Sequence, residues 1–167
     1  TRIALAGGLP TSYTAQRRRR GHQEAMRGAG LEPRADHETA LGYTAEQGRQ
    51  SLRQLAQLEP RPTAVVVANV NAAVGLLAEA HALGIDVPRE LSVATVLDSW
   101  TAENTWPPLT AVRQEIQEMG AQAMRILLEQ LRAPAGANGV NGQGPRPAHV
   151  RLPTSLVVRG STAPPSR

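Results

Sequence analysis

The chain has 167 residues, of which 41% are hydrophobic and 19% charged, enough for one domain or for two small lobes. It contains no Cys, no Phe and no Lys, so all 18 basic residues are Arg. Disulfides, thiol catalysis, cysteine zinc sites and lysine chemistry are therefore excluded. With two Trp and two Tyr, the core is expected to be aliphatic.

The charge balance says little about partners. The net charge is +4, but the 14 acidic residues are interspersed among the basic ones, so the excess is a weak argument for nucleic-acid binding. No uncharged apolar run approaches the roughly 18 residues that a membrane-spanning helix needs. We expect a cytoplasmic protein without a membrane contact.

The first elements suggest a chain that starts within a larger protein. Thr1 leads directly into an apolar run ended by Gly7, which predicts a strand. A helix is expected from a cap at Thr14 to the glycines at Gly28 and Gly30. Because the chain opens on a strand and without Met, we expect sequence upstream that includes further function.

The next segments indicate a parallel sheet. A weak strand is predicted at 35–38, and the Thr44–Gln47 pair is a capping-box pattern that opens a helix ending before Pro60. The β-branched run at 63–68 is typical of a strand buried on both faces. Such strands occur mainly in parallel sheets covered by helices.

The unit of strand and helix then repeats, with a helix at 71–83 and a strand at 91–97. This alternation predicts an α/β fold with a doubly wound, mostly parallel sheet and helices on both faces. Residues 98–108 read as irregular. A helix over 114–131 follows, with an apolar side that has no partner in the predicted sheet.

The carboxyl-terminal part carries fewer signals. The Gly- and Pro-rich stretch 133–147 lacks periodicity and predicts a flexible surface loop. Two strand-like pieces, 149–152 and 156–159, are separated by Pro153, which suits a chain passing from one sheet to another.

Catalytic motifs are missing. The four His residues are widely spread and do not match zinc-binding spacings, no G-x-S-x-G elbow occurs, and a Walker sequence is impossible without Lys. We expect no metal, no cofactor and no enzymatic activity.

The run Arg17–Arg20 does not form one basic stripe on a helix, because successive residues turn by about 100°. Three of the four are expected to be solvated and to pair with acids such as Glu24, which leaves one to point into a cleft above the strand ends.

Two polar residues follow buried strands, at the edge where doubly wound sheets bind ligands. Asn69 follows the strand at 63–68 and Asp98 follows the next one. Asn69 suits hydroxyl groups because it both donates and accepts, and a helix cap is an equally good interpretation. Asp98 has the same two interpretations, a ligand contact or a loop and capping residue.

Four ordered segments, 62–69, 84–93, 107–114 and 156–162, together resemble the carboxyl-terminal part of the lac-repressor (LacI/GalR) family of bacterial transcription regulators. The resemblance implies a two-lobed, periplasmic-binding-protein-like core that binds a small effector, often a sugar, between the lobes. It assigns 1–112 and 154–167 to the distal lobe and 113–153 to a remnant of the proximal lobe. The helix at 114–131 then lacks most of its sheet and is exposed or buried against a second chain.

The resemblance also implies the effector-binding residues. Arg18 falls at the family's ligand-binding Arg, Tyr43 at an aromatic that stacks on sugars, and Asn69 at a polar contact; Gln114 lies at the lobe crossing. The chain departs from the family at Leu97, where an Asp commonly binds effector hydroxyls. Either Asp98 replaces it, or the effector is less hydroxylated, or the response is lost.

The two Trp residues, Trp100 and Trp106, have two interpretations: a wall of the effector site, for which we select Trp106, or core packing.

The expected function is therefore effector binding and homodimerisation in a LacI-type regulator, in which the ligand changes the affinity for operator DNA. DNA contact is expected only through an amino-terminal helix-turn-helix absent from this chain. A solute-binding protein of a sugar transport system is the alternative, and an enzyme on a doubly wound sheet is a third reading.

Overall fold

A computed structural model describes residues 2–132 and 149–164. The loop predicted at 133–147 lies outside the described residues. The chain divides into two compact units, Thr1–Arg113 with Leu156–Arg167, and Gln114–Ser155. The chain passes between them twice, at 113–114 and at 155–156.

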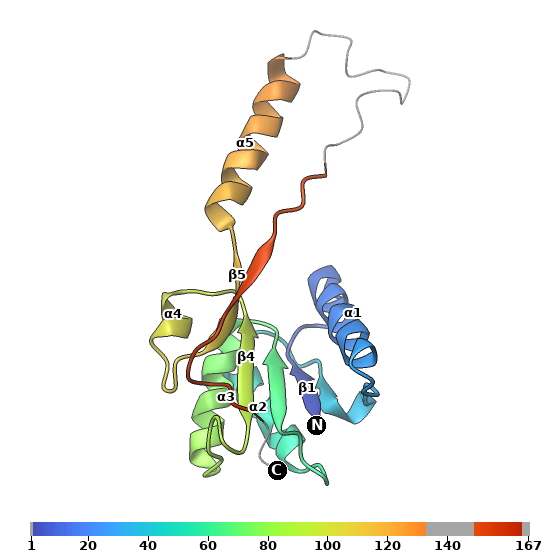
Figure 1. Cartoon of the computed structure of the whole chain (residues 1–167), viewed down its shortest axis with the longest axis vertical. Helices are drawn as coiled ribbons and strands as arrows, with labels where there is room; N and C mark the ends of the chain where they lie inside the picture. The colour runs from blue at the N-terminus through green and yellow to red at the C-terminus, as the bar shows by residue number, and fades with distance from the viewer. Residues whose placement is uncertain (1, 133–148, 165–167) are drawn as a thin grey trace. The chain divides into compact units, whose positions relative to one another are not determined.

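The larger unit is built on a twisted sheet with strand order β2-β1-β3-β4-β5-β6, in which the pairs from β2 through β5 are parallel. The chain winds outward from β1 in both directions, so the predicted doubly wound α/β class is confirmed (Figure 1). The elements in chain order are β1 (Ile3–Ala6), α1 (Tyr13–Gly28), the 3₁₀ turn η1 (Ala35–His37), β2 (Glu38–Thr39), α2 (Ala45–Ala56), β3 (Ala64–Val67), α3 (Val70–Ala82), β4 (Ser92–Val96), α4 (Trp100–Glu103), β5 (Thr110–Gln114), α5 (Ile116–Arg132) and β6 (Thr154–Val157).

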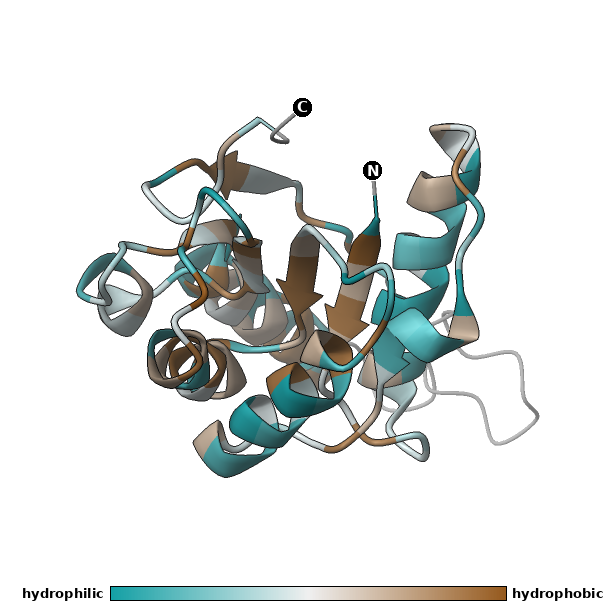
Figure 2. Ribbon diagram, turned by 90° about the horizontal axis from the view of Figure 1, so that it is seen from below, coloured by the Kyte–Doolittle hydropathy of each residue, from teal (hydrophilic) through white to brown (hydrophobic). Residues whose placement is uncertain are grey.

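The core of this unit is aliphatic, as the composition predicts. Val67 and Val93 from the central strands pack with Leu52 of α2 and Leu76 of α3, and all four are at most 2% exposed. Figure 2 shows the apolar strands between the α2–α3 pair and the mostly hydrophilic α1. Met26 is the one buried residue of α1. The helix is therefore held to the unit largely by polar contacts.

The α2–α3 pair is unusually close. A Cβ atom added to Gly48 would lie 1.9 Å from the Ala72 carbonyl oxygen, and one added to Gly75 would lie 1.8 Å from the Ala45 carbonyl oxygen. Each helix thus needs a glycine where the backbone of the other helix approaches it. Between the same helices Arg53 makes a two-point ion pair with buried Glu79, at 2.7 and 3.0 Å, which lowers the pKa of that carboxyl.

The local signals explain most element boundaries. The capping box is confirmed, because the Thr44 hydroxyl accepts from the Gln47 amide and the Gln47 side chain accepts from the Thr44 amide. The cap of α1 is Ser12, so the prediction of Thr14 was wrong by two residues. Asn69 caps α3, whose first residue is Val70. The cap interpretation of Asn69 is therefore confirmed.

Three segments differ from the prediction. The region 98–108 contains the short helix α4, capped by Ser99, rather than only loop. The weak strand at 35–38 is a 3₁₀ turn followed by the two-residue β2. In the tail, 149–153 forms no strand and the strand β6 begins at Thr154.

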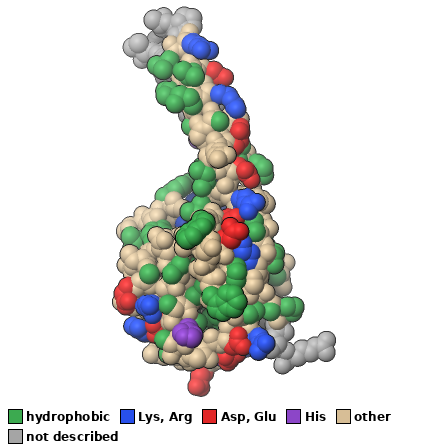
Figure 3. Space-filling model, turned by 90° about the vertical axis from the view of Figure 1, so that its left-hand side faces the viewer, with side chains coloured by type: hydrophobic (Ala, Val, Ile, Leu, Met, Phe, Trp, Pro, Cys, Tyr) green, Lys and Arg blue, Asp and Glu red, His purple; other side chains and the backbone are tan. Residues whose placement is uncertain are grey.

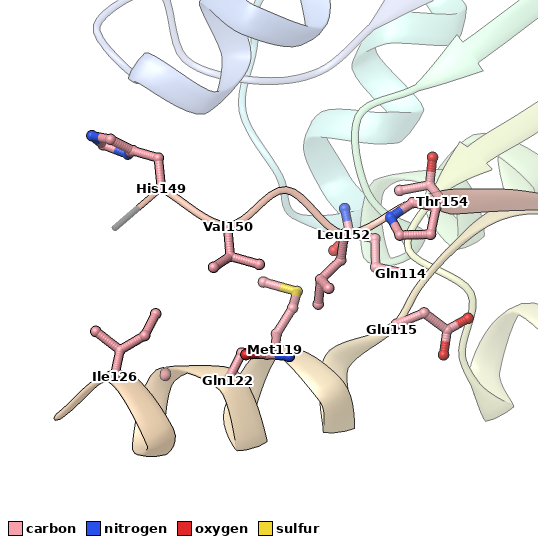
Figure 4. A pocket seen from close by; sticks show the side chains of 11 residues that line it. Gln114, Glu115, Met119, Gln122, Ile126, His149, Val150, Leu152 and Thr154 are labelled. Carbon is pink, nitrogen blue, oxygen red and sulfur yellow. The ribbon is translucent and has the colours of Figure 1, made fainter. Parts of the chain in front are cut away.

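The described part of the smaller unit comprises α5 and an extended segment, 149–155, that shares a hollow with the helix. No residue of α5 is buried, and hydrophobic side chains stand out along the helix (Figure 3). Figure 4 shows Met119 and Ile126 directed toward Val150 and Leu152 of the extended segment, across a hollow of about 430 Å³. Among the described residues, no helix is long and apolar enough to cross a membrane. The exposed large apolar residues of α5 are Ile116, Met119, Met124, Leu127, Leu128 and Leu131.

Candidate functional site

The carboxyl ends of the parallel strands bring the candidate residues to one edge of the larger unit. Val67 pairs with Thr95, and Thr95 with Ala111. Two residues further along the three strands, the row at the edge is Asn69, Leu97 and Arg113. Neighbouring strands are about 4.8 Å apart, so these positions lie within reach of one small molecule.

Arg18 reaches this edge from α1. Its Nη1 donates to the Ala68 carbonyl oxygen at 2.8 Å, one residue before Asn69. The other members of the arginine run point elsewhere, as the helical turn predicts: Arg17 lies over the Tyr13 ring, Arg19 contacts Glu38 and Arg20 binds Glu24.

Tyr43 and Asn69 line one hollow of about 520 Å³ at the same edge, together with Thr44, Asn71 and Thr101. The Tyr43 hydroxyl donates to Ser12 at 3.1 Å, which fixes its ring beside the start of α1. The Asn69 side-chain oxygen accepts from the Ala72 amide at 2.9 Å. The NH₂ group of Asn69 remains for a ligand, so capping and ligand binding are compatible in this residue.

The Asp98 carboxylate has two cationic partners within the chain, and its role as an effector contact stays a proposal. Its side chain is 8% exposed, and Oδ2 accepts from Arg113 Nε and Nη2 at 3.0 and 2.8 Å. Arg159 Nη1 lies 2.8 Å from Oδ1 but donates its hydrogen bond to the Leu109 carbonyl. The contact between Arg159 and Asp98 is therefore an ion pair without a hydrogen bond. The proximity of Arg159, then that of Arg113, lowers the pKa of Asp98 despite its desolvation.

Leu97 stands at the middle of the edge in a left-handed conformation, with φ of 80°. Such a backbone is costly for a side chain other than Gly, Asn or Asp, and strain of this kind gathers at functional sites. The amides of Leu97 and Asp98 both donate to the Val112 carbonyl, at 3.1 and 2.9 Å, and hold the turn in place.

The structure separates Trp106 from the other candidates. It lines a hollow with Leu77, Ala80 and His81 on the carboxyl-terminal half of α3, whereas Asn69 caps the other end of that helix. Twelve helical residues span about 18 Å. Trp106 is 91% exposed, so both interpretations, site wall and core packing, are corrected to surface exposure. Trp100 is 76% exposed on α4.

Gln114 is the last residue of β5 and belongs to the smaller unit, where it lines the hollow beside Met119 (Figure 4). Its role as an effector contact stays a proposal.

Sequence reasoning missed Arg113 and Arg159, the partners of Asp98. Arg113 lies within β5, at the end of the first segment of the larger unit, and Arg159 lies far along the chain in the returning segment. No local pattern marks them as a pair around Asp98. Groups of His, Asp or Glu suited to hold a metal ion do not occur in the part of the chain that the structure describes.

Comparison with known proteins gives a consistent result. The model of the periplasmic binding protein-like domain matches residues 1–162. The HTH-type transcriptional regulator reg1 of Streptomyces lividans is 37% identical over 98% of this chain and 46% of its own length. A LacI family transcriptional regulator from Mycobacterium smegmatis has a TM-score of 0.81 and 35% identity over 99% of this chain and 58% of that chain.

A further solved structure is that of the transcriptional regulator CelR in complex with cellobiose, with a TM-score of 0.82 and 29% identity over 96% of this chain and 46% of that chain. The chain spans about half the length of the curated relatives that it matches first.

Proposed function

This chain belongs to the periplasmic binding protein-like family, in the form found in LacI-type transcriptional regulators, and from this membership we propose that it is the effector-binding region of such a regulator. The observation that carries the proposal is that Tyr43 and Asn69 line one hollow at the strand edge, while Arg18 bonds the Ala68 carbonyl one residue before Asn69. Arg18 comes from α1, Tyr43 precedes α2 and Asn69 caps α3.

In this proposal a small metabolite, a sugar or a related compound, is bound at the carboxyl edge of the larger unit. Arg18 and Asn69 supply hydrogen-bond donors, and the half-buried Tyr43 ring supplies a stacking surface. A ligand that prefers one arrangement of the two lobes of the regulator shifts its operator affinity by linkage. Operator contact belongs to a separate DNA-binding domain.

We further propose that residues 1–112 with 154–167 form the distal lobe and that 113–153 belong to the proximal lobe. The regulator is proposed to be a cytoplasmic homodimer. Trp106 is 91% exposed and lies beside the apolar Leu77 and Val87, and an exposed apolar surface of this kind supports contact with a second subunit.

The relatives are regulators and not enzymes or transport proteins, so neither alternative from the sequence is favoured.

Calorimetric titration with a panel of sugars, sugar acids and sugar phosphates tests the binding proposal. We expect saturable binding that Arg18→Ala weakens by about tenfold or more, because charged hydrogen bonds contribute roughly 1.5–3 kcal/mol. Asn69→Ser is expected to weaken binding while keeping the helix cap, since Ser caps as well as Asn. The control is Arg20→Ala, whose side chain pairs with Glu24 on the outer face of α1.

Equal binding by Arg18→Ala, Asn69→Ser and the parent chain would show that the site lies elsewhere. The melting temperature of each variant without ligand separates loss of a contact from loss of the fold.

A further inference from the structure

The charge at the carboxyl edge identifies the class of effector more closely than the family does. The Asp98 carboxylate is shared by two guanidinium groups, Arg113 and Arg159, so this cluster keeps one positive charge in excess. Arg18 adds a second positive charge at the end of β3. The edge is therefore electropositive in the larger unit.

Arg18 is not neutralised by the protein. Among the described residues it forms no ion pair, and its one side-chain hydrogen bond goes to the neutral Ala68 carbonyl, which uses one of its five N–H groups. A planar guanidinium with free N–H groups matches the two oxygens of a carboxylate or phosphate group.

No Asp or Glu is among the described side chains that line the hollow at this edge. The Asn69 oxygen is used by the α3 cap, which leaves its NH₂ group, and Leu97 is apolar. Of the acids on neighbouring elements, Glu38 of β2 is paired with Arg19, and Glu46 accepts from Gln50 along its own helix. Glu103 is exposed at the end of α4. The amino-terminal ends of α1, α2 and α3 start at this edge and add partial positive charge.

We propose that the effector is an anionic metabolite, a sugar acid or a sugar phosphate, whose acidic group is bound by Arg18 and Asn69. This inference rests on the proposed effector-binding function. Leu97 sets the specificity: an acidic residue at this position, between Asn69 and Arg113, would repel the anion and accept from neutral hydroxyl groups, whereas Leu97 leaves the positive charge uncompensated.

The test is calorimetry on the purified chain with glucose, gluconate and glucose 6-phosphate, which differ in the acidic group. We expect gluconate or glucose 6-phosphate to bind at least about tenfold more tightly than glucose, since charge-assisted hydrogen bonds are roughly twice as strong as neutral ones. The tighter of the two anions distinguishes a carboxylate from a phosphate as the recognised group. Raised salt concentration should reduce this preference.

Two variants at Leu97 isolate charge from backbone strain. Asp and Asn both tolerate the left-handed conformation and differ mainly in charge. Leu97→Asp is expected to weaken anion binding about tenfold relative to Leu97→Asn and to spare glucose. Arg18→Lys keeps the charge but not the planar fork, and is expected to retain part of the anion binding.

The outcomes separate the two proposals. Tightest binding of glucose, or anion binding that is unchanged by Arg18→Ala, would overturn the anionic effector and leave effector binding in place. If no compound of the three or of the wider sugar panel binds, effector binding by this chain fails and the anionic effector fails with it.

Discussion

Replacing Gly75 by alanine is expected to destabilise the larger unit by about 3 kcal/mol or more, at the upper end of overpacking costs. The new Cβ would lie 1.8 Å from the Ala45 carbonyl oxygen, so α2 and α3 must move apart. That movement would loosen the layer that packs on β1 and β3, and the added helix propensity of alanine, under about 1 kcal/mol, cannot offset it. Urea unfolding followed by far-ultraviolet circular dichroism measures the loss.

The matched control is Gly21→Ala in α1, where an added Cβ meets nothing within 4 Å. There alanine is expected to raise the free energy of unfolding by up to about 1 kcal/mol through helix propensity. Tryptophan fluorescence is a poor probe for either variant, because both Trp side chains are exposed. A loss below about 1 kcal/mol for Gly75→Ala would contradict the close approach of the helices.

The second large effect is expected at Asp98. Asp98→Asn keeps the shape of the side chain but removes the charge that holds Arg113 and Arg159, and we expect a loss of about 2 kcal/mol at neutral pH, the size of one or two charged hydrogen bonds. This figure allows for Arg113, whose side chain is 51% exposed and screened by solvent. Thermal and urea unfolding at pH 7 measure the difference.

The pH dependence follows from the direction of the shift. Because the pKa of Asp98 is lower in the folded chain, its contribution is present above the carboxyl pKa of the unfolded chain and is lost as the pH falls through the folded value. The difference between parent and Asp98→Asn should therefore shrink below about pH 4. Asp86→Asn is the control, since Asp86 pairs with the 85% exposed Arg89 and should change stability by less than about 0.5 kcal/mol. Equal losses of unfolding free energy for the two variants would contradict a stabilising role for the pairing of Asp98 with Arg113 and Arg159.

Elements with a strong local signal were predictable from the sequence. The β-branched run at 63–68 predicted the strand β3, and the Thr44–Gln47 spacing predicted a helix start, because both depend on neighbouring residues alone. Burial of β3 on both faces was predicted too, but its residues alternate between partly and fully buried. The divergence of Arg17–Arg20 followed from helix geometry. Asn69 was placed at the carboxyl edge because it follows a buried strand, whereas Arg18 was selected from the arginine run by the family resemblance.

Features set by distant residues were not predictable. Asp98 follows a strand as a ligand contact would, yet Arg159 from the returning segment approaches its carboxylate, and no local pattern encodes that pair. Trp106 is close in sequence to the edge residues, but in the fold it lies beside the carboxyl-terminal half of α3, away from the Asn69 cap. The four residues of α4 are too few to show a helical period.

The most direct test of the central claim, that a small effector binds at the carboxyl edge of the larger unit, is nuclear magnetic resonance of the ¹⁵N-labelled chain during titration with the tightest of the three probes. We predict the largest shifts at the Asn69 side-chain amide, the Leu97 backbone amide and the Arg18 Nε–H. The indole N–H of Trp106 should stay unchanged. Shifts centred on Trp106, with the Arg18 and Asn69 signals unmoved, would contradict the account.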